Sequence, residues 1–173
     1  MRGCLVALLV ESTTPKETRD DWNTPPWLLD MVRKFKPIEL DPCPNKWSFV
    51  NPRVQSLRGL DGLSLAWALG SGLIFVNPPY SNGLYQKFCA KIAEEARLGA
   101  EIIALVPANV ETRAWQAYLW GADAFCFPKR RINFYCQGEE RKGVNFASVL
   151  VYFGNDSARF AEVFGELGKV LIA

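Results

Sequence analysis

Leu73-Ile74-Phe75-Val76-Asn77-Pro78-Pro79-Tyr80-Ser81 is the stretch of this 173-residue chain that decides the fold. Its first four residues are apolar, and all but the first are β-branched or aromatic, which predicts a buried strand of a mostly parallel sheet. The two prolines then donate no backbone N–H and restrict φ, so the strand must end at Asn77. The pattern therefore predicts an amide and an aromatic ring held rigidly at a strand's carboxyl end, where open α/β sheets bind ligands.

The turn Asn77-Pro78-Pro79-Tyr80 resembles the catalytic loop of methyltransferases that use S-adenosylmethionine to modify exocyclic or amide nitrogens. The residue types suit that chemistry, because the amino nitrogen of adenine is a poor nucleophile that must be held in line with the sulfonium methyl. The side-chain oxygen of Asn77 and the Pro78 carbonyl could accept its two N–H groups, and Tyr80 could stack on the base. The alternative is a tight strand-to-loop turn with a packed tyrosine, since Asn and Pro are common in turns.

The length and composition of the chain predict one globular domain. We place it at residues 21–173, after an N-terminal extension and linker over residues 1–20. Hydrophobic residues make up 49% of the sequence and charged residues 22%, which excludes a largely disordered chain. The net charge of +2 indicates nothing about partners by itself, so an electrostatic argument must depend on local clusters.

The chain has five cysteines without a CxxC pair and no histidine, so we expect no metal site. Without histidine, Ser-His and Cys-His nucleophiles are also excluded. Unpaired cysteines fit free thiols in a reducing compartment, so we expect a cytoplasmic protein. No apolar run approaches the roughly 20 residues of a spanning helix, and residues 4–10 could form an edge strand or a loosely attached leader.

The segment Trp22-Asn23-Thr24-Pro25 precedes the expected sheet. Thr24 is placed to cap a helix whose first turn tolerates Pro25 and Pro26. An apolar face at helical spacing continues that helix with Trp27, Leu28, Met31 and Val32. The same segment resembles the cofactor-side motif that precedes the sheet in amino-methyltransferases.

Two acids are candidates for cofactor contacts. Asp41 ends a short strand that we expect to be the first of the sheet, and it could bind the cofactor's methionine amino group or form an Asx-turn. The usual glycine-rich loop is absent there, because the chain continues as Pro42-Cys43-Pro44-Asn45. Asp61 could contact the ribose or the adenine amino group of the cofactor, or cap a helix over residues 64–69.

Further elements follow the hydrophobic pattern of the sequence. We predict helices over residues 84–96, 112–119 and 157–167, strands over residues 101–109, 124–127 and 145–153, and a short strand within residues 46–54. The strand at 73–76, the helix and the next strand would form a right-handed crossover. The strand at 145–153 would pair antiparallel with its neighbour.

One basic run, Lys129-Arg130-Arg131, is followed by aromatic residues and by a hairpin-like loop that carries Arg141 and Lys142. Such a run is usually a solvated face. Because it is interleaved with aromatic rings, it could instead contact phosphates of a nucleic acid.

The order of these segments resembles the phage DNA N-6-adenine methyltransferase family over about residues 20–155. The segments are Trp22-Asn23-Thr24-Pro25, Leu40-Asp41, Leu60-Asp61-Gly62-Leu63 with Trp67, Asn77-Pro78-Pro79-Tyr80-Ser81, the strand ending at Pro107-Ala108, and Arg131 with Phe134.

The resemblance implies a Rossmann-like class I methyltransferase with a mostly parallel central sheet, an antiparallel last strand and helices on both faces. It implies S-adenosylmethionine as cofactor and an adenine extruded from double-stranded DNA as acceptor. The implied catalytic residues are Asn77, Pro78, Pro79 and Tyr80. The implied cofactor contacts are Trp22, Thr24, Pro25, Asp41, Asp61 and Asn77. The expected DNA contacts are Ser81, Lys129, Arg130, Arg131, Arg141 and Lys142.

Two other classes remain open at this stage. A related enzyme could methylate cytosine N4, RNA or a protein glutamine amide, since all of them present an NH₂ group to the same turn. A catalytically inactive domain that binds nucleic acid is also compatible with the missing glycine-rich loop.

Overall fold

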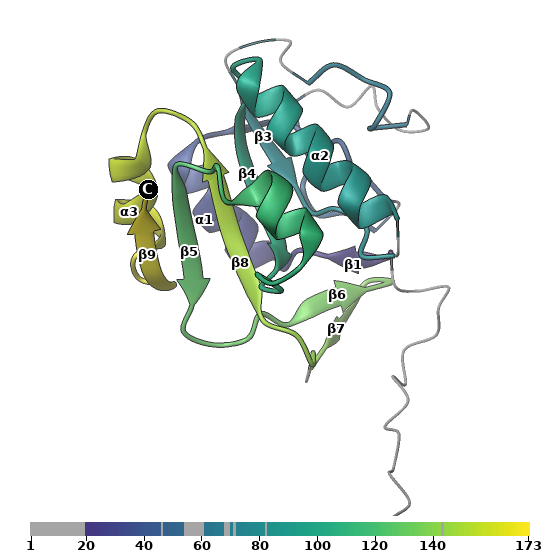
Figure 1. The fold of residues 1–173 in the computed structure, drawn as a ribbon. Helices are drawn as coiled ribbons and strands as arrows, with labels where there is room; N and C mark the ends of the chain where they lie inside the picture. Colours follow the sequence, from purple (N-terminus) through teal and green to yellow (C-terminus); the bar gives the residue numbers. More distant parts are fainter. Residues whose placement is uncertain are drawn as a thin grey trace, which may run out of the picture.

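A computed structural model describes residues 20–45, 47–53, 61–67, 70, 72–81, 83–142 and 144–173 (Figure 1). The candidate strand or leader at residues 4–10 lies outside these residues. The chain folds around a six-stranded sheet. In spatial order, its strands are β2 (Ile38–Leu40), β3 (Leu73–Val76), β4 (Glu101–Pro107), β8 (Ser148–Phe153), β5 (Ala124–Pro128) and β9 (Gly168–Ile172).

The prediction of a mostly parallel, Rossmann-like sheet is wrong. Only the β2–β3 and β3–β4 pairs are parallel, whereas β4–β8, β8–β5 and β5–β9 are antiparallel. The prediction took complete burial of a strand as a sign of parallel pairing. The antiparallel pairing predicted for the strand at 145–153 is confirmed in β8, which is nevertheless buried at all six positions, so burial does not report strand direction here.

A second sheet of three strands was not predicted. It consists of β1 (Trp22–Asn23), β6 (Phe134–Cys136) and β7 (Glu139–Arg141), paired antiparallel in the order β1-β6-β7. β6 and β7 form a hairpin whose turn residues Gln137 and Gly138 both have positive φ, as two-residue hairpin turns require. In Figure 1 this small sheet lies below the large one, at the end where β4 and β5 terminate.

Four helices accompany the strands: α1 (Pro26–Phe35), α2 (Leu84–Arg97), the π-helix η2 (Trp115–Leu119) and α3 (Ser157–Phe164). They agree in position with the predicted helices, although residues 115–119 are π-helical. Among the described residues 47–53 and 61–67, neither the short strand nor the helix expected there is present.

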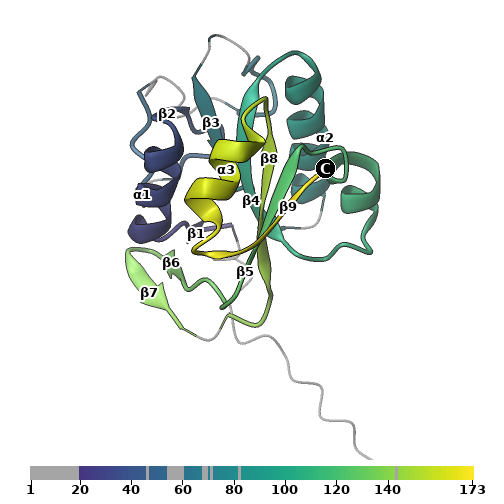
Figure 2. The same ribbon diagram turned by 90° about the vertical axis from the view of Figure 1, so that its left-hand side faces the viewer.

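Alternate residues along the central strands belong to two apolar clusters. Phe75 and Leu105 lie in the cluster with α1 and α3, whereas Val76 and Val106 lie in the cluster with α2 and η2. Because successive strand residues point to opposite faces, each pair of helices buries its own face of the sheet. Figure 2 shows α1 and α2 on opposite sides of the strands.

The edge that matters for function is where β2, β3, β4 and β5 end. β2, β3 and β4 are parallel, and β5 runs in the direction of β4 because both are antiparallel to β8. The residues that follow these four strands therefore lie along one edge of the sheet. They begin with Asp41, Asn77, Ala108 and Lys129.

Candidate active site

Asn77 follows β3 directly, and its amide is fixed by two hydrogen bonds. Its Nδ2 donates to the Trp22 carbonyl at 2.7 Å, and its Oδ1 accepts from the Tyr80 hydroxyl at 3.0 Å. The first bond orients the amide, because only the nitrogen can donate to a carbonyl. Its oxygen is thereby turned towards Tyr80, and it has a second lone pair with which to accept.

The Tyr80 side chain is surrounded by other aromatic side chains. Its ring makes edge-to-face contacts with Tyr85, Phe134 and Phe146, at centroid distances of 6.2, 6.3 and 5.5 Å. Its hydroxyl also lies 3.4 Å from the Leu105 carbonyl. Burial raises the pKa of the Tyr80 hydroxyl above its ordinary value, so the group remains a donor.

The segment before α1 contacts the turn at residues 77–81. Trp22 pairs with Cys136 across the β1–β6 ladder, and its ring packs against Phe134 at 6.0 Å. Asp20 Oδ1 accepts from the backbone N–H of Ser81 at 3.0 Å. The turn at 77–81 is therefore attached at both ends to residues more than 50 positions earlier in the chain.

A cavity of about 460 Å³ opens beside Tyr80. Of the predicted site residues, Trp22, Tyr80 and Ser81 line it. Its other lining residues include Tyr85, Gln86, Pro107, Asn109, Thr112, Arg113, Asn145 and Phe146. Asn109 could have been found from the sequence, since it follows the proline that ends β4, but nothing in the sequence distinguishes Arg113.

Asp41 lies at the end of β2 and is only 4% exposed. Its Oδ1 accepts from the Cys43 backbone N–H at 2.9 Å, and its Oδ2 accepts from the Ser48 hydroxyl at 3.3 Å. Desolvation raises the pKa of Asp41 to about 6, although both hydrogen bonds act in the opposite direction. The Asx-turn alternative is thus correct for one oxygen, and the described residues give the carboxylate no charged partner.

Thr24 does not cap α1, contrary to the prediction. The residue before the helix is Pro25, in an extended conformation and without a side-chain cap. The Thr24 hydroxyl is buried and has no hydrogen-bond partner among the described residues. A buried hydroxyl without a partner costs about 1–3 kcal/mol, so a ligand that bonds to it would recover that free energy.

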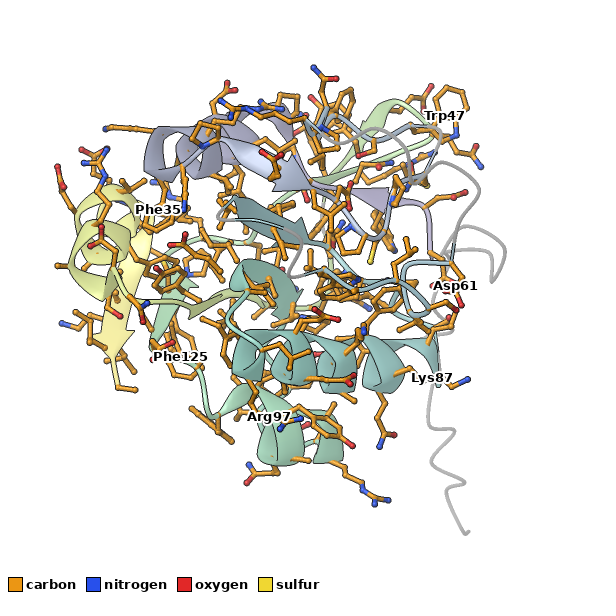
Figure 3. All side chains as sticks on the ribbon, turned by 90° about the horizontal axis from the view of Figure 1, so that it is seen from above. Phe35, Trp47, Asp61, Lys87, Arg97 and Phe125 are labelled. Carbon is orange, nitrogen blue, oxygen red and sulfur yellow. The ribbon has the colours of Figure 1, made fainter. Side chains whose placement is uncertain are left out.

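Asp61 is exposed, and it closes its own turn. Its carboxylate accepts from the Leu63 N–H at 3.0 Å and from the Ser64 hydroxyl at 2.9 Å. The next residue, Gly62, lies so close to the Pro42 carbonyl that any side chain would collide with it. The two acidic segments are therefore in contact. Figure 3 shows Asp61 towards the side of Lys87, away from Phe35.

The predicted DNA contacts are in different environments. Lys129 and Arg130 are exposed after β5, whereas Arg131 donates to the Val144 carbonyl at 2.6 Å. Arg141 pairs with Glu139 at 3.6 Å on the hairpin. Lys142 follows β7 and is exposed. Because the hairpin also carries Glu140, it is a weaker candidate for phosphate contact than Lys129 and Arg130.

Asp41 and Thr24 are chemically suited to S-adenosylmethionine, although neither of them lines the cavity beside Tyr80. The cofactor carries an ammonium, a sulfonium, a carboxylate and hydroxyl groups. Asp41 would gain a cationic partner and Thr24 a hydrogen bond, which are the two interactions that the described residues do not supply. No cluster of three or more His, Cys, Asp or Glu side chains that could hold a metal ion occurs in the described part of the chain.

Comparison with known proteins placed the chain in a family. A family model described as DNA N-6-adenine-methyltransferase (Dam) matches residues 11–161. No curated protein and no solved structure matched the chain. None of the helices in the described part of the chain has the length and apolar character of a membrane-spanning helix.

Proposed function

Since the chain belongs to the DNA N-6-adenine-methyltransferase (Dam) family, we propose that it transfers the methyl group of S-adenosylmethionine to N6 of an adenine extruded from double-stranded DNA. The family supports a DNA adenine methyltransferase. The donor, the extrusion of the base and recognition of a particular site are our proposals, as is action in the cytoplasm, where such DNA is available.

The observation that carries this proposal is the fixed amide of Asn77. The Trp22 carbonyl holds its nitrogen, so its oxygen faces the hydroxyl of Tyr80, a residue that lines the cavity. An adenine N6 has two N–H groups, and Asn77 Oδ1 and the Pro78 carbonyl offer two acceptors on one turn. Accepting from both would orient the nitrogen and stabilise the positive charge that develops on it.

The proposed roles of the remaining residues follow from their positions. Asp41 would bind the ammonium of the cofactor and Thr24 would bond to a polar group of it. The bound cofactor supplies an electrophilic methyl group. N6 gains this methyl as the sulfur–methyl bond breaks, the sulfonium leaves as a thioether, and N6 loses one proton to solvent, which is compatible with a turn that contains no base. Tyr80 would stack on the adenine, and its aromatic neighbours would exclude water.

The experiment that tests the proposal is transfer of a tritiated methyl group from S-adenosylmethionine to DNA, RNA and protein, followed by identification of the modified group. We expect label on N6 of adenine in DNA. Label on cytosine N4, RNA or glutamine would assign another acceptor to the same turn. Absence of label from all three, with a folded protein that binds the cofactor, would exclude the enzyme.

Tyr80 variants test the proposed stacking. Tyr80→Phe should keep most of the single-turnover rate, because the Trp22 carbonyl still orients Asn77 without the hydroxyl. Tyr80→Ala should lose about 1–3 kcal/mol of stacking and favour the unextruded complex. A 2-aminopurine fluorescence signal at the target position measures extrusion in both variants. If phenylalanine is as damaging as alanine, the hydroxyl is required and the stacking role is wrong.

A further inference from the structure

Trp27 forms part of a second cavity that the proposed chemistry does not use. This residue lies in the first turn of α1 and is 46% exposed, although it belongs to the apolar face of that helix in the sequence. The cavity measures about 360 Å³, and its lining includes Lys129, Arg130, Arg131 and Glu166. We call it the Trp27 groove. Single-stranded nucleic acid binds to sites of this kind, because its bases stack on exposed aromatic rings and its phosphates contact neighbouring cations.

The wall opposite Trp27 is rigid. The backbone N–H of Lys129 donates to the Leu167 carbonyl at 3.1 Å. Beside it, Gly168 packs so tightly against the backbone of Phe127 that a Cβ could not be accommodated. Figure 2 shows the start of α1, the β5–β6 connection and the α3–β9 connection at the same end of the molecule. The backbone at Lys129, where the run of cations begins, is therefore anchored.

The positive charge of the groove favours an anionic ligand. Lys129 and Arg130 are exposed, and within the described ranges neither side chain has a hydrogen bond or an ion pair. Arg131 is engaged with Val144, and Glu166 supplies the opposing charge. The first turn of α1 contains no acid, so the positive end of the helix dipole adds to the cations.

The groove is connected to the candidate active site through Arg131. Arg131 lines the groove and bonds to Val144, and the next two residues, Asn145 and Phe146, line the cavity beside Tyr80. A nucleic acid strand with one base in that cavity would have its neighbouring nucleotides close to the groove.

We propose that the Trp27 groove holds the DNA strand next to the target adenine. The indole of Trp27 stacks on a neighbouring base that loses its own stacking when the adenine is extruded, and Lys129 and Arg130 contact the adjacent phosphates. This assignment rests on the proposed function, because it needs DNA as the substrate. It adds a second base site outside the catalytic cavity.

The test is DNA affinity measured by fluorescence anisotropy at several salt concentrations. Trp27→Ala should weaken binding about 5- to 150-fold with an unchanged log–log salt slope, and Trp27→Phe much less. Lys129→Ala with Arg130→Ala should lower that slope by about 0.9 for each phosphate that the protein no longer neutralises. Trp120→Ala is the matched control, since Trp120 is a tryptophan 44% exposed outside the groove.

Abasic substitutions in the DNA test the same stacking without any change in the protein. Removing the base at the correct flanking position should weaken binding to the wild-type protein and leave binding to Trp27→Ala nearly unchanged. If no flanking position has this effect, or if Trp27→Ala loses no more affinity than Trp120→Ala, the groove does not hold a base.

Methyl transfer by the wild-type protein separates this inference from the proposed function. Transfer to adenine with no effect of Trp27 on DNA affinity overturns only the groove. Trp27-dependent DNA binding without transfer would overturn the proposed enzyme and, with it, the place of the groove beside a target adenine, and would leave only a DNA-binding groove.

Discussion

Asn77→Ala is expected to lower the single-turnover rate of methyl transfer by about 10²–10³-fold, with little change in affinity for DNA or cofactor. The reason is that an acceptor for the adenine amino group acts mainly as charge develops on the nitrogen, and loss of a comparable oxyanion-hole donor has this magnitude. Rapid-quench measurement with saturating DNA and S-adenosylmethionine gives the rate, and calorimetry gives the two affinities.

The matched control is Asn155→Ala, because Asn155 is an exposed asparagine beyond the opposite end of the sheet. It should transfer methyl at the wild-type rate. If Asn77→Ala also does so, the turn is structural and the proposed enzyme fails with it. If instead both affinities fall with the rate, Asn77 holds the site together and is not specific to the transition state.

Asp41→Asn is expected to weaken S-adenosylmethionine binding by roughly 10- to 150-fold, which is the loss of a charge-assisted hydrogen bond of about 1.5–3 kcal/mol. The wild-type affinity should also depend on pH. The pKa of Asp41 is raised to about 6, so the carboxylate is charged above pH 7 and the affinity for the cationic cofactor should be highest there. The affinity should fall as the carboxylate is protonated below pH 6. The variant should lack this step.

The same substitution should stabilise the ligand-free protein. A folded pKa of about 6 against 3.8 means that burial disfavours the charged carboxylate, so Asp41 lowers stability as pH rises from 3.8 to about 6, and the loss is complete above that value. At pH 8, Asp41→Asn should therefore raise the free energy of unfolding, by at most about 3 kcal/mol. Urea denaturation at pH 5 and pH 8 measures this difference.

Asp30→Asn, at an acid that is 73% exposed on α1, serves as the control for both measurements. It should change neither the cofactor affinity nor the pH dependence of stability. Unaltered affinity in a folded Asp41→Asn protein would remove Asp41 from the cofactor site, whatever its effect on stability.

The sequence was most informative where proline and apolar runs act locally. Pro78 and Pro107 end two buried strands, and the structure confirms both strands and the common edge at which they end. The direction of the strands as a set could not be obtained in this way, although the antiparallel pairing of β8 was predicted from the family resemblance. It depends on where β8 is inserted, between β4 and β5, and that is decided by long-range pairing. β9 was missed because its partly exposed residues form no buried run.

For the candidate site, the sequence could predict individual residues but not the contacts between distant residues. Asn77 and Tyr80 were proposed from the sequence because the turn itself is distinctive. The hydrogen bond from Asn77 to Trp22 spans 55 positions, and the Arg131–Val144 bond depends on the hairpin, so neither has a signal in the sequence. Thr24 was assigned to a cap by its spacing, but Pro25 occupies that position.

The hydroxyl of Tyr80 bears on how the product leaves. In this structure the hydroxyl donates a hydrogen bond to Asn77 Oδ1, which is the oxygen proposed to bind the substrate. The Leu105 carbonyl is its second acceptor. A methylated N6 retains one N–H, so it can satisfy only one of the two acceptors on the turn. The Tyr80 hydroxyl can then return to Asn77 as the base is expelled. We therefore expect Tyr80→Phe to slow steady-state turnover more than the single-turnover rate, and equal effects on both would exclude this role.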